Sequence, residues 1–143
     1  MADREWHDLY RVRPIGVIRS PLTERKDCPH QAYDGAPEAW VEIDPAFAEG
    51  LSGIAPGNEV ILLTWFHAAS RDVLRVHPRG RTEDPSRGVF LTRSPDRPNP
   101  IGLHRVEVLE IEGPGRFRVR SLEVLDGTPV IDIKSILAKS ADS

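Results

Sequence analysis

Cysteine is almost absent, because the chain of 143 residues contains only Cys28. A single cysteine excludes an internal disulfide framework and a metal cage made of cysteines alone. The longest apolar stretch, 60–66, is interrupted by Thr64 and is far too short to span a membrane. The first ten residues are polar and lack the apolar core of a signal peptide. We therefore expect one cytoplasmic domain over residues 1–143, with no membrane partner.

Common nucleotide and metal motifs are also missing. The sequence has no G-x-G-x-x-G after a strand and no G-x-x-x-x-G-K-[ST], so neither a Rossmann nor a P-loop site is indicated. It has no H-E-x-x-H or C-x-x-C, and we expect no metal site. G-x-S-x-G is absent too, which leaves no serine with the context of a nucleophile.

Charge is unevenly distributed along the chain. The net charge of −3 argues weakly against nucleic-acid binding. The segment 71–105, however, holds eight arginines against four acidic residues, whereas the remaining chain holds 11 basic and 18 acidic residues. A basic stripe on an acidic body suits an anionic ligand, and a solvated arginine-rich loop is an equally good interpretation of the composition.

Thirteen prolines and eleven glycines divide the chain into short segments, which favours an all-β protein. Asp44 and Pro45 mark the start of a helix that ends near Gly50. The apolar segment 59–67 predicts a strand buried on both faces. About seven strands and one or two short helices predict a mostly β, closed or nearly closed barrel. The predicted strands are 15–19, 39–43, 59–67, 89–92, 103–111, 116–122 and 130–136, with a hairpin turn at 112–115.

The segment 88–102, GVFLTRSPDRPNPIG, carries three prolines within six residues. Proline fixes φ and removes a backbone donor, so this loop is stiff and cannot join a sheet. Arg93 and Arg97 then project from a preorganised frame, which lowers the entropy lost on binding a ligand. The alternative is a rigid surface loop whose arginines pair with Asp96 or Glu83.

The segment 126–134, DGTPVIDIK, begins with a turn signal and runs into a strand. Strand alternation places Val130, Asp132 and Lys134 on one face and the two isoleucines on the other. Asp132 and Lys134 are either an ion pair at a site or a solvent-side pair worth little. His67, at the end of the most apolar strand, is likewise either a site residue or a core histidine.

These segments, together with IGVIRSP at 15–21, Pro29-His30-Gln31 and Trp65-Phe66-His67, occur in an order that resembles the TrmO/TsaA family over about residues 13–136. The resemblance implies a small barrel of non-Rossmann type that binds S-adenosylmethionine and works as a homodimer with the cofactor near the subunit interface. It also implies methylation of the N6 nitrogen of threonylcarbamoyl-adenosine beside the anticodon of certain tRNAs. The cofactor contacts it implies are Pro29, His30, Gln31, His67, Ala68, Arg93, Leu103, Asp126, Gly127, Thr128 and Pro129.

Two positions depart from the family pattern. His30 stands where the family usually has arginine, and Ser135-Ile136 replaces Pro-Tyr after Asp132-Ile133-Lys134. The second change replaces a rigid aromatic-bearing segment with a flexible one. The extra C-terminal domain of longer TrmO proteins is also not expected here, because the sequence ends at Ser143.

Methyl transfer from a sulfonium needs mainly in-line alignment of nucleophile, methyl and sulfur. The acceptor nitrogen must lose a proton, for which Asp132 is favoured over Asp126. Arg97 and Lys134 complete the expected catalytic set, and arginines 71, 93 and 97 suit phosphate or carboxylate. Two alternatives stay open: a small-molecule methyltransferase, and a module that binds S-adenosylmethionine without catalysis.

Overall fold

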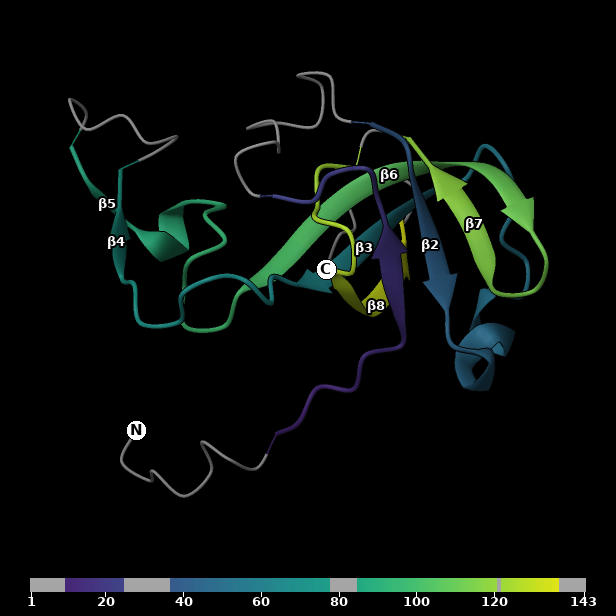
Figure 1. Cartoon of the computed structure of the whole chain (residues 1–143), viewed down its shortest axis with the longest axis horizontal. Helices are drawn as coiled ribbons and strands as arrows, with labels where there is room; N and C mark the ends of the chain where they lie inside the picture. Colours follow the sequence, from purple (N-terminus) through teal and green to yellow (C-terminus); the bar gives the residue numbers. More distant parts are fainter. Residues whose placement is uncertain (1–9, 25–36, 78–84, 121, 137–143) are drawn as a thin grey trace.

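The computed structural model describes residues 10–24, 37–77, 85–120 and 122–136. Pro29, His30 and Gln31 lie outside these described residues. Six strands form the main body, and a separate excursion carrying two short strands projects to one side of it (Figure 1). Within the described part of the chain, no helix has the length and apolar character needed to cross a membrane.

The six main strands are hydrogen-bonded in the cyclic order β1-β2-β7-β6-β3-β8, with antiparallel neighbours throughout. Gly16 of β1 pairs with Val130 of β8, and this contact closes the sheet into a barrel. Closure leaves no free edge along this part of the sheet. The strands are β1 Gly16–Arg19, β2 Ala39–Ile43, β3 Glu59–Trp65, β6 Ile101–Glu112, β7 Arg116–Val119 and β8 Pro129–Ser135.

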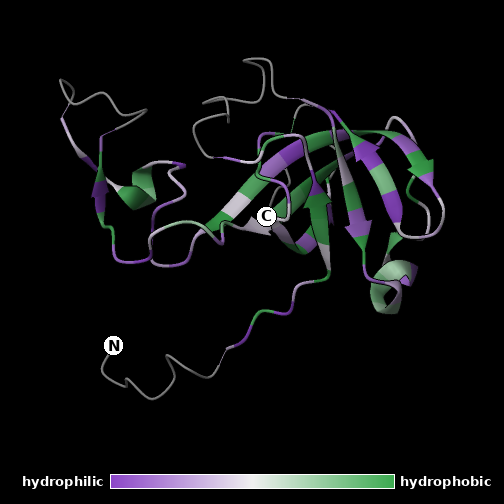
Figure 2. Ribbon diagram, in the orientation of Figure 1, coloured by the Kyte–Doolittle hydropathy of each residue, from purple (hydrophilic) through white to green (hydrophobic). Residues whose placement is uncertain are grey.

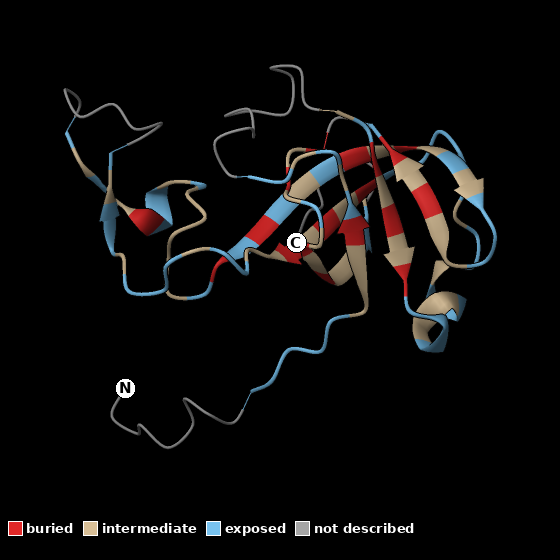
Figure 3. Cartoon of the chain, in the orientation of Figure 1, coloured by how far each residue is buried: buried red, intermediate tan, exposed pale blue. Residues whose placement is uncertain are grey.

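The interior of the barrel is filled by the side chains of alternate residues along the strands. The strands alternate between hydrophobic and hydrophilic residues (Figure 2), and the buried positions alternate in step (Figure 3). Ile18, Leu62 and Phe117 are fully buried and belong to one core cluster. Full burial of such side chains contributes about 1.5–3 kcal/mol each. The mostly β fold predicted from the sequence is therefore confirmed.

Antiparallel alternation sends the connections to two opposite ends of the barrel. The connections 20–38, 66–100 and 120–128 leave from one end, which we call the mouth. The connection 44–58 and the hairpin turn at 113–115 leave from the other end, which we call the base. The long connection 66–100, described at 66–77 and 85–100, is called the arm (Figure 1).

A short helix lies at the base, as the sequence predicts. The 3-10 helix η4, Pro45–Leu51, has Asp44 as its N-cap, whose carboxylate accepts a hydrogen bond from the backbone N–H of Ala46 at 2.9 Å. Gly113 follows β6 with φ +72°, a conformation that glycine adopts without strain. The hairpin predicted at 112–115 is confirmed, with its turn at 113–115, because Glu112 is the last residue of β6.

Three local predictions were wrong. The segment 59–67 is not buried on both faces, because only Val60, Leu62 and Thr64 point into the barrel. On the outer face of β3, Glu59 is exposed and the other alternate residues are half-buried. Residues Val89–Leu91 form the 3-10 helix η6 and not a strand, since the backbone N–H of Thr92 donates back to the carbonyl of Val89. The third error concerns β8.

The predicted shared face of Val130, Asp132 and Lys134 is interrupted by a bulge. Val130 pairs with Thr64 and is fully buried, whereas Asp132 pairs with Leu63 on the outer face. Between these two pairs the chain advances by two residues in β8 but by only one in β3. The inward and outward positions of β8 are therefore exchanged after the bulge. Asp132 and Lys134 do share the outer face.

Candidate functional site at the mouth of the barrel

The two halves of the arm are held together by hydrogen bonds within the arm itself. Strands β4 Arg75–Val76 and β5 Arg87–Gly88 pair with each other, and the backbone N–H of Val89 donates to the carbonyl of Leu74. At the root of the arm, the Arg71 guanidinium donates to the carbonyl of Pro98 at 2.7 Å and to the Asn99 amide oxygen at 3.0 Å. The proline-rich loop is thus fastened at both ends.

Arg97 turns inward, contrary to the prediction that it projects toward a ligand. Its guanidinium donates to the carbonyls of Val89 at 2.7 Å, Thr92 at 2.5 Å and Ser94 at 2.8 Å. These acceptors belong to the same loop, so the Arg97 side chain clamps η6 and the following turn. Proline rigidity and this clamp together fix the loop that carries Arg93.

Arg93 is exposed, and within the described residues it has no hydrogen bond or ion pair. Its charge lies close enough to His104 to lower the pKa of that imidazole, after the larger effect of burial, to about 4. Arg93 therefore presents a free guanidinium at the mouth, a group that suits a carboxylate or phosphate.

The turn before β8 is fastened to β1. The Asp126 carboxylate accepts a hydrogen bond from the backbone N–H of Ser20 at 3.0 Å, and the backbone N–H of Gly127 donates to the carbonyl of Ile18. Gly127 has φ +84°, and Thr128 is buried with its hydroxyl donating to the carbonyl of Leu125. Pro129 opens β8, so the whole predicted segment Asp126–Pro129 lies at the mouth.

The remaining predicted contacts divide between two surfaces. His67 and Ala68 are exposed in the turn after β3, and the alternative of a core histidine at His67 was wrong. Leu103 is 48% exposed on the outer face of β6, where it pairs with Leu63 of β3. The topology thus brings the described cofactor candidates to the mouth and to the adjoining outer face.

Asp132 lies on that same outer face, one strand beyond Leu63. Its carboxylate is 3.0 Å from the Lys134 ammonium and accepts a hydrogen bond from the backbone N–H of Ile133. Both side chains of the ion pair are about half exposed, which makes the pair worth less than about 1 kcal/mol. Ser135, where the sequence departs from the family pattern, is the last residue of β8 and pairs with Val60 of β3.

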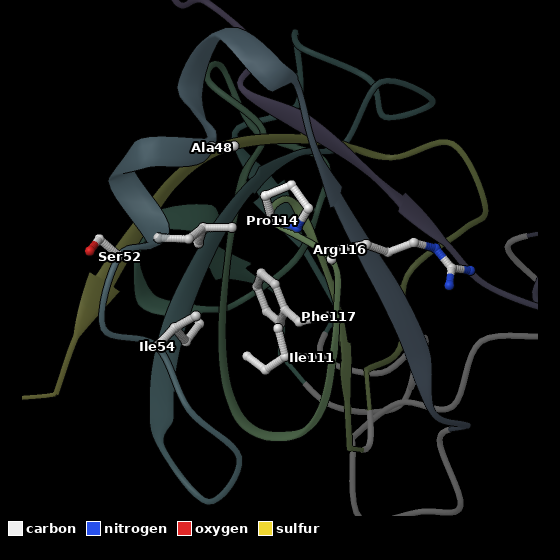
Figure 4. A pocket seen from close by; sticks show the side chains of 9 residues that line it. Ala48, Ser52, Ile54, Ile111, Pro114, Arg116 and Phe117 are labelled. Carbon is white, nitrogen blue, oxygen red and sulfur yellow. The ribbon is translucent and has the colours of Figure 1, made fainter.

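Two cavities lie at the base and not at the mouth. One has a volume of about 290 Å³ and is lined mainly by apolar side chains, among them Ile54, Ile111, Pro114 and Phe117 (Figure 4). The other, about 790 Å³, is a wide groove that includes Asp132 and Ile136. No group of three or more potential metal ligands gathers among the residues described.

Arginines of the barrel and of the arm have different partners. On the barrel, arginines 19, 105, 116, 118 and 120 each pair with a glutamate. On the arm, arginines 71, 75 and 97 donate to carbonyl, hydroxyl or amide oxygens, which carry no net charge. Among the described residues, these arm arginines are thus held by uncharged oxygens, whereas the barrel arginines are held by glutamates.

Sequence reasoning missed one cluster at the mouth. Thr64, Phe66 and His104 converge on Gly102, and the Thr64 hydroxyl is 2.9 Å from Nε2 of His104. The only sequence signal was the alternation of Gly102 and His104 along a strand.

The chain matches the family model described as the tRNA-methyltransferase O N-terminal domain over residues 17–143. It is 47% identical over 135 residues to a probable S-adenosyl-L-methionine-binding protein of Methanothermobacter thermautotrophicus, covering 94% of this chain and 92% of the relative. A second S-adenosyl-L-methionine-binding protein, from Archaeoglobus fulgidus, is 50% identical over 123 residues and 86% of each chain.

Solved structures give a similar result. A crystal structure of TrmO from Pseudomonas aeruginosa superposes with a TM-score of 0.70 at 35% identity and covers 94% of this chain. The match spans 60% of that longer protein. Another TrmO crystal structure gives a TM-score of 0.71 at 36% identity, with 94% of this chain and 62% of the other covered.

Proposed function

The chain belongs to the TrmO family, and on this premise we propose that it is an S-adenosylmethionine-dependent methyltransferase that acts on N6 of threonylcarbamoyl-adenosine in tRNA. The observation that carries the proposal is the placement at the mouth of Arg93 and the His67–Ala68 turn, both from the arm, together with the Asp126–Pro129 turn from the connection before β8. Loops presented from one end of a rigid barrel are a common setting for a binding site.

The residues at the mouth fit the chemistry of S-adenosylmethionine. The guanidinium of Arg93 suits the carboxylate of the amino-acid part, and the exposed Leu103 offers an apolar surface for the adenine ring. Asp126 supplies an exposed carboxylate for hydroxyl or ammonium groups. When bound, the cofactor would supply a methyl group already activated by the sulfonium.

The chain's own residues then have distinct roles in the proposal. Asp132 accepts the proton that the acceptor nitrogen releases, and the Lys134 ammonium, 3.0 Å away, holds that carboxylate in place. Arg97 serves as a positioning residue, because its guanidinium is fully engaged by the loop that presents Arg93.

The arm is the surface proposed to contact tRNA. Its described part holds five arginines and two aspartates, and three of the arginines are held by uncharged oxygens. An excess of positive charge attracts the phosphate backbone, with an affinity that falls as salt rises. A tRNA substrate also agrees with the cytoplasmic location expected from the sequence.

A homodimer is part of the same proposal. Leu74, Phe90 and Leu91 are 62%, 75% and 78% exposed on the arm, and Ile101 and Leu103 add exposed apolar surface on β6. In η6, Val89 is buried whereas Phe90 and Leu91 are exposed, and Figure 3 shows this helix on the projecting arm, apart from the barrel. Exposed large apolar side chains of this kind favour an interface with another molecule.

The test is mass analysis of tRNA nucleosides from cells with and without the gene, complemented by wild type or by Asp132→Asn. Wild type should restore the N6-methylated threonylcarbamoyl nucleoside, and Asp132→Asn should not. The control variant Glu110→Gln alters a carboxylate on another part of the barrel and should behave as wild type. Persistence of the nucleoside without the gene would contradict the tRNA assignment.

Calorimetry with S-adenosylmethionine then separates the remaining possibilities. Binding without tRNA methylation would favour a small-molecule methyltransferase or a non-catalytic binding module. The names of the two archaeal relatives mention binding of S-adenosylmethionine and so agree with the binding module. Absence of binding by the purified protein would overturn the cofactor assignment as well.

A further inference from the structure

The ladder between β3 and β6 ends at the mouth, where the two limbs of the arm begin. Its last pair is formed by Trp65, and the next bond runs from the backbone N–H of Phe66 to the carbonyl of Pro100 at 2.8 Å. Prolines 95, 98 and 100 have no backbone N–H, so the second limb cannot continue a regular ladder with the first. The limbs are joined in another way.

Side chains supply the hydrogen bonds that connect the limbs beyond the ladder. The Arg71 guanidinium of the first limb donates to the carbonyl of Pro98 at 2.7 Å and to the Asn99 amide oxygen at 3.0 Å. In the other direction, the Asp96 carboxylate of the second limb accepts from the backbone N–H of Ser70 at 2.9 Å. Arg71 thus provides donors at a point where a proline provides none.

Arg71 also closes the first limb onto the end of β3. Its Cζ atom lies 5.1 Å from the centroid of the Trp65 ring, in position for a cation–π contact. The two residues meet at the ends of the loop 65–71, and the exposed His67–Ala68 turn forms the middle of that loop. Both sides of the turn are fixed, because the backbone N–H groups of Phe66 and Ser70 donate to the second limb.

We propose that Arg71 is a positioning residue for the His67–Ala68 turn: by joining the end of β3 to the second limb of the arm, its guanidinium holds the turn in the conformation that contacts the methyl donor. The inference rests on the proposed function, in which this turn forms part of the S-adenosylmethionine site. It gives Arg71 a role other than the phosphate or carboxylate contact that the sequence suggests. A turn that is ordered before binding loses less entropy when the ligand arrives.

Calorimetry with S-adenosylmethionine on purified wild type and variants tests the inference. Arg71→Ala should weaken binding by about tenfold, because the turn must then be ordered during binding. Arg71→Lys retains the charge but lacks the planar fork that reaches two acceptors, so it should recover little of the lost affinity.

Arg116→Ala is the matched control. Arg116 also lies over a tryptophan, with Cζ 3.8 Å from the centroid of the Trp40 ring, and it donates to two other side chains. It borders the cavity at the base, far along the barrel from the mouth. Its removal takes away the same kinds of contact and should leave the affinity for S-adenosylmethionine at the wild-type value.

A double-mutant cycle with His67→Ala separates positioning of the turn from a general loss of stability. If Arg71 acts through the turn, Arg71→Ala should weaken binding by less than about threefold once the His67 side chain has been removed. A merely structural role would give the same factor in both backgrounds, and that result would overturn the inference. Wild-type affinity in Arg71→Lys would also overturn it, because charge alone would then be sufficient.

If Arg71→Ala does not fold, hydrogen exchange of Arg71→Lys provides the second measurement. The amide of Ser70, which donates to Asp96, and the amide of Arg97, which donates to the carbonyl of Ser70 at 3.1 Å, join the limbs. Both should exchange at least about threefold faster than in wild type. Unchanged exchange would show that the limbs stay joined without the fork and would overturn the inference. Wild type that binds no S-adenosylmethionine would instead contradict the proposed function, and the inference with it.

Discussion

The guanidinium of Arg97 donates a hydrogen bond of 2.7 Å to the carbonyl of Val89, the first residue of η6. The same Nη2 atom reaches the carbonyl of Thr92 just beyond the end of that helix. One side chain therefore bridges the start and the end of η6. Because Arg93 follows directly after Thr92, the direction of its backbone depends on this bridge.

Arg97→Ala should loosen the loop without unfolding the barrel. The substitution removes the guanidinium donor from the carbonyls of Val89, Thr92 and Ser94. These carbonyls belong to the arm and take no part in the hydrogen bonds between barrel strands. We expect hydrogen exchange of the amides at 92–97 to rise at least about tenfold, while the melting temperature falls by only a few degrees. Arg97→Lys should rescue little, because an ammonium lacks the planar fork. Unchanged exchange in Arg97→Ala would contradict the clamp.

Arg93→Ala should weaken binding of S-adenosylmethionine by about tenfold to a hundredfold, as expected for loss of a charged hydrogen bond worth about 1.5–3 kcal/mol. Thermal stability should be unchanged, since Arg93 is exposed. The control Arg105→Ala removes an exposed partner of Glu59 at 3.2 Å and should leave the affinity unchanged. Equal affinities of wild type and Arg93→Ala would remove Arg93 from the site.

The double substitution Phe90→Ser with Leu91→Ser should weaken self-association. Burial of each side chain contributes about 2 kcal/mol, so a two-fold symmetric interface that uses both should weaken by at least about a hundredfold in dissociation constant. Sedimentation velocity across a concentration series measures this. Val12→Ser changes an exposed apolar residue outside the arm and is the matched control. An unchanged sedimentation profile would remove η6 from the interface.

His104 should make the fold sensitive to mild acid. Its pKa is lowered to about 4 in the folded protein, whereas the unfolded chain protonates near 6.5. The unfolded state thus binds more protons between these values, and the free energy of unfolding falls as the pH decreases from 6.5 toward 4. The full loss is on the order of 3 kcal/mol. Urea unfolding of wild type and His104→Gln measures it, and the variant should lose less stability over this range.

Gly102→Ala should destabilise the barrel by about 1–3 kcal/mol, because the new methyl group overlaps Thr64, Phe66 and His104. Gly88→Ala is the control, since a Cβ there meets open space and the backbone is extended. Urea midpoints compare the two variants. Equal midpoints would show that the cluster at the mouth can relax at no cost.

Much of the barrel could be predicted from the sequence because its strands follow simple alternation. Ala39–Ile43 was predicted with the observed bounds, and Asp44 was predicted as the cap of the following helix. Local signals were sufficient there, since inward apolar residues and a capping carboxylate need no distant partner. The mouth turn at Asp126–Pro129 was found for the same reason.

The arm and the His104 cluster could not be predicted in this way. Residues Val89–Leu91 resemble a strand by composition, but Arg97 donates to the carbonyl of Val89 and stabilises a helical turn. The bulge in β8 is invisible to a pattern of period two, because its cause is the pairing with Thr64 and Leu63 on another strand. The contact between Thr64 and His104 likewise depends on the register of two strands, and register is a property of the assembled sheet.

Closure of the barrel by β1 and β8 has a consequence for folding. During synthesis β1 can pair with β2 as soon as both have emerged, but its other edge stays open until β8 leaves the ribosome. Pairing between such distant strands slows folding, and an open strand edge is prone to wrong association while it waits. We therefore expect this protein to need a chaperone while the barrel lacks β8. Such a chaperone would have to cover Gly16 and Val17, the residues of β1 that later pair with β8.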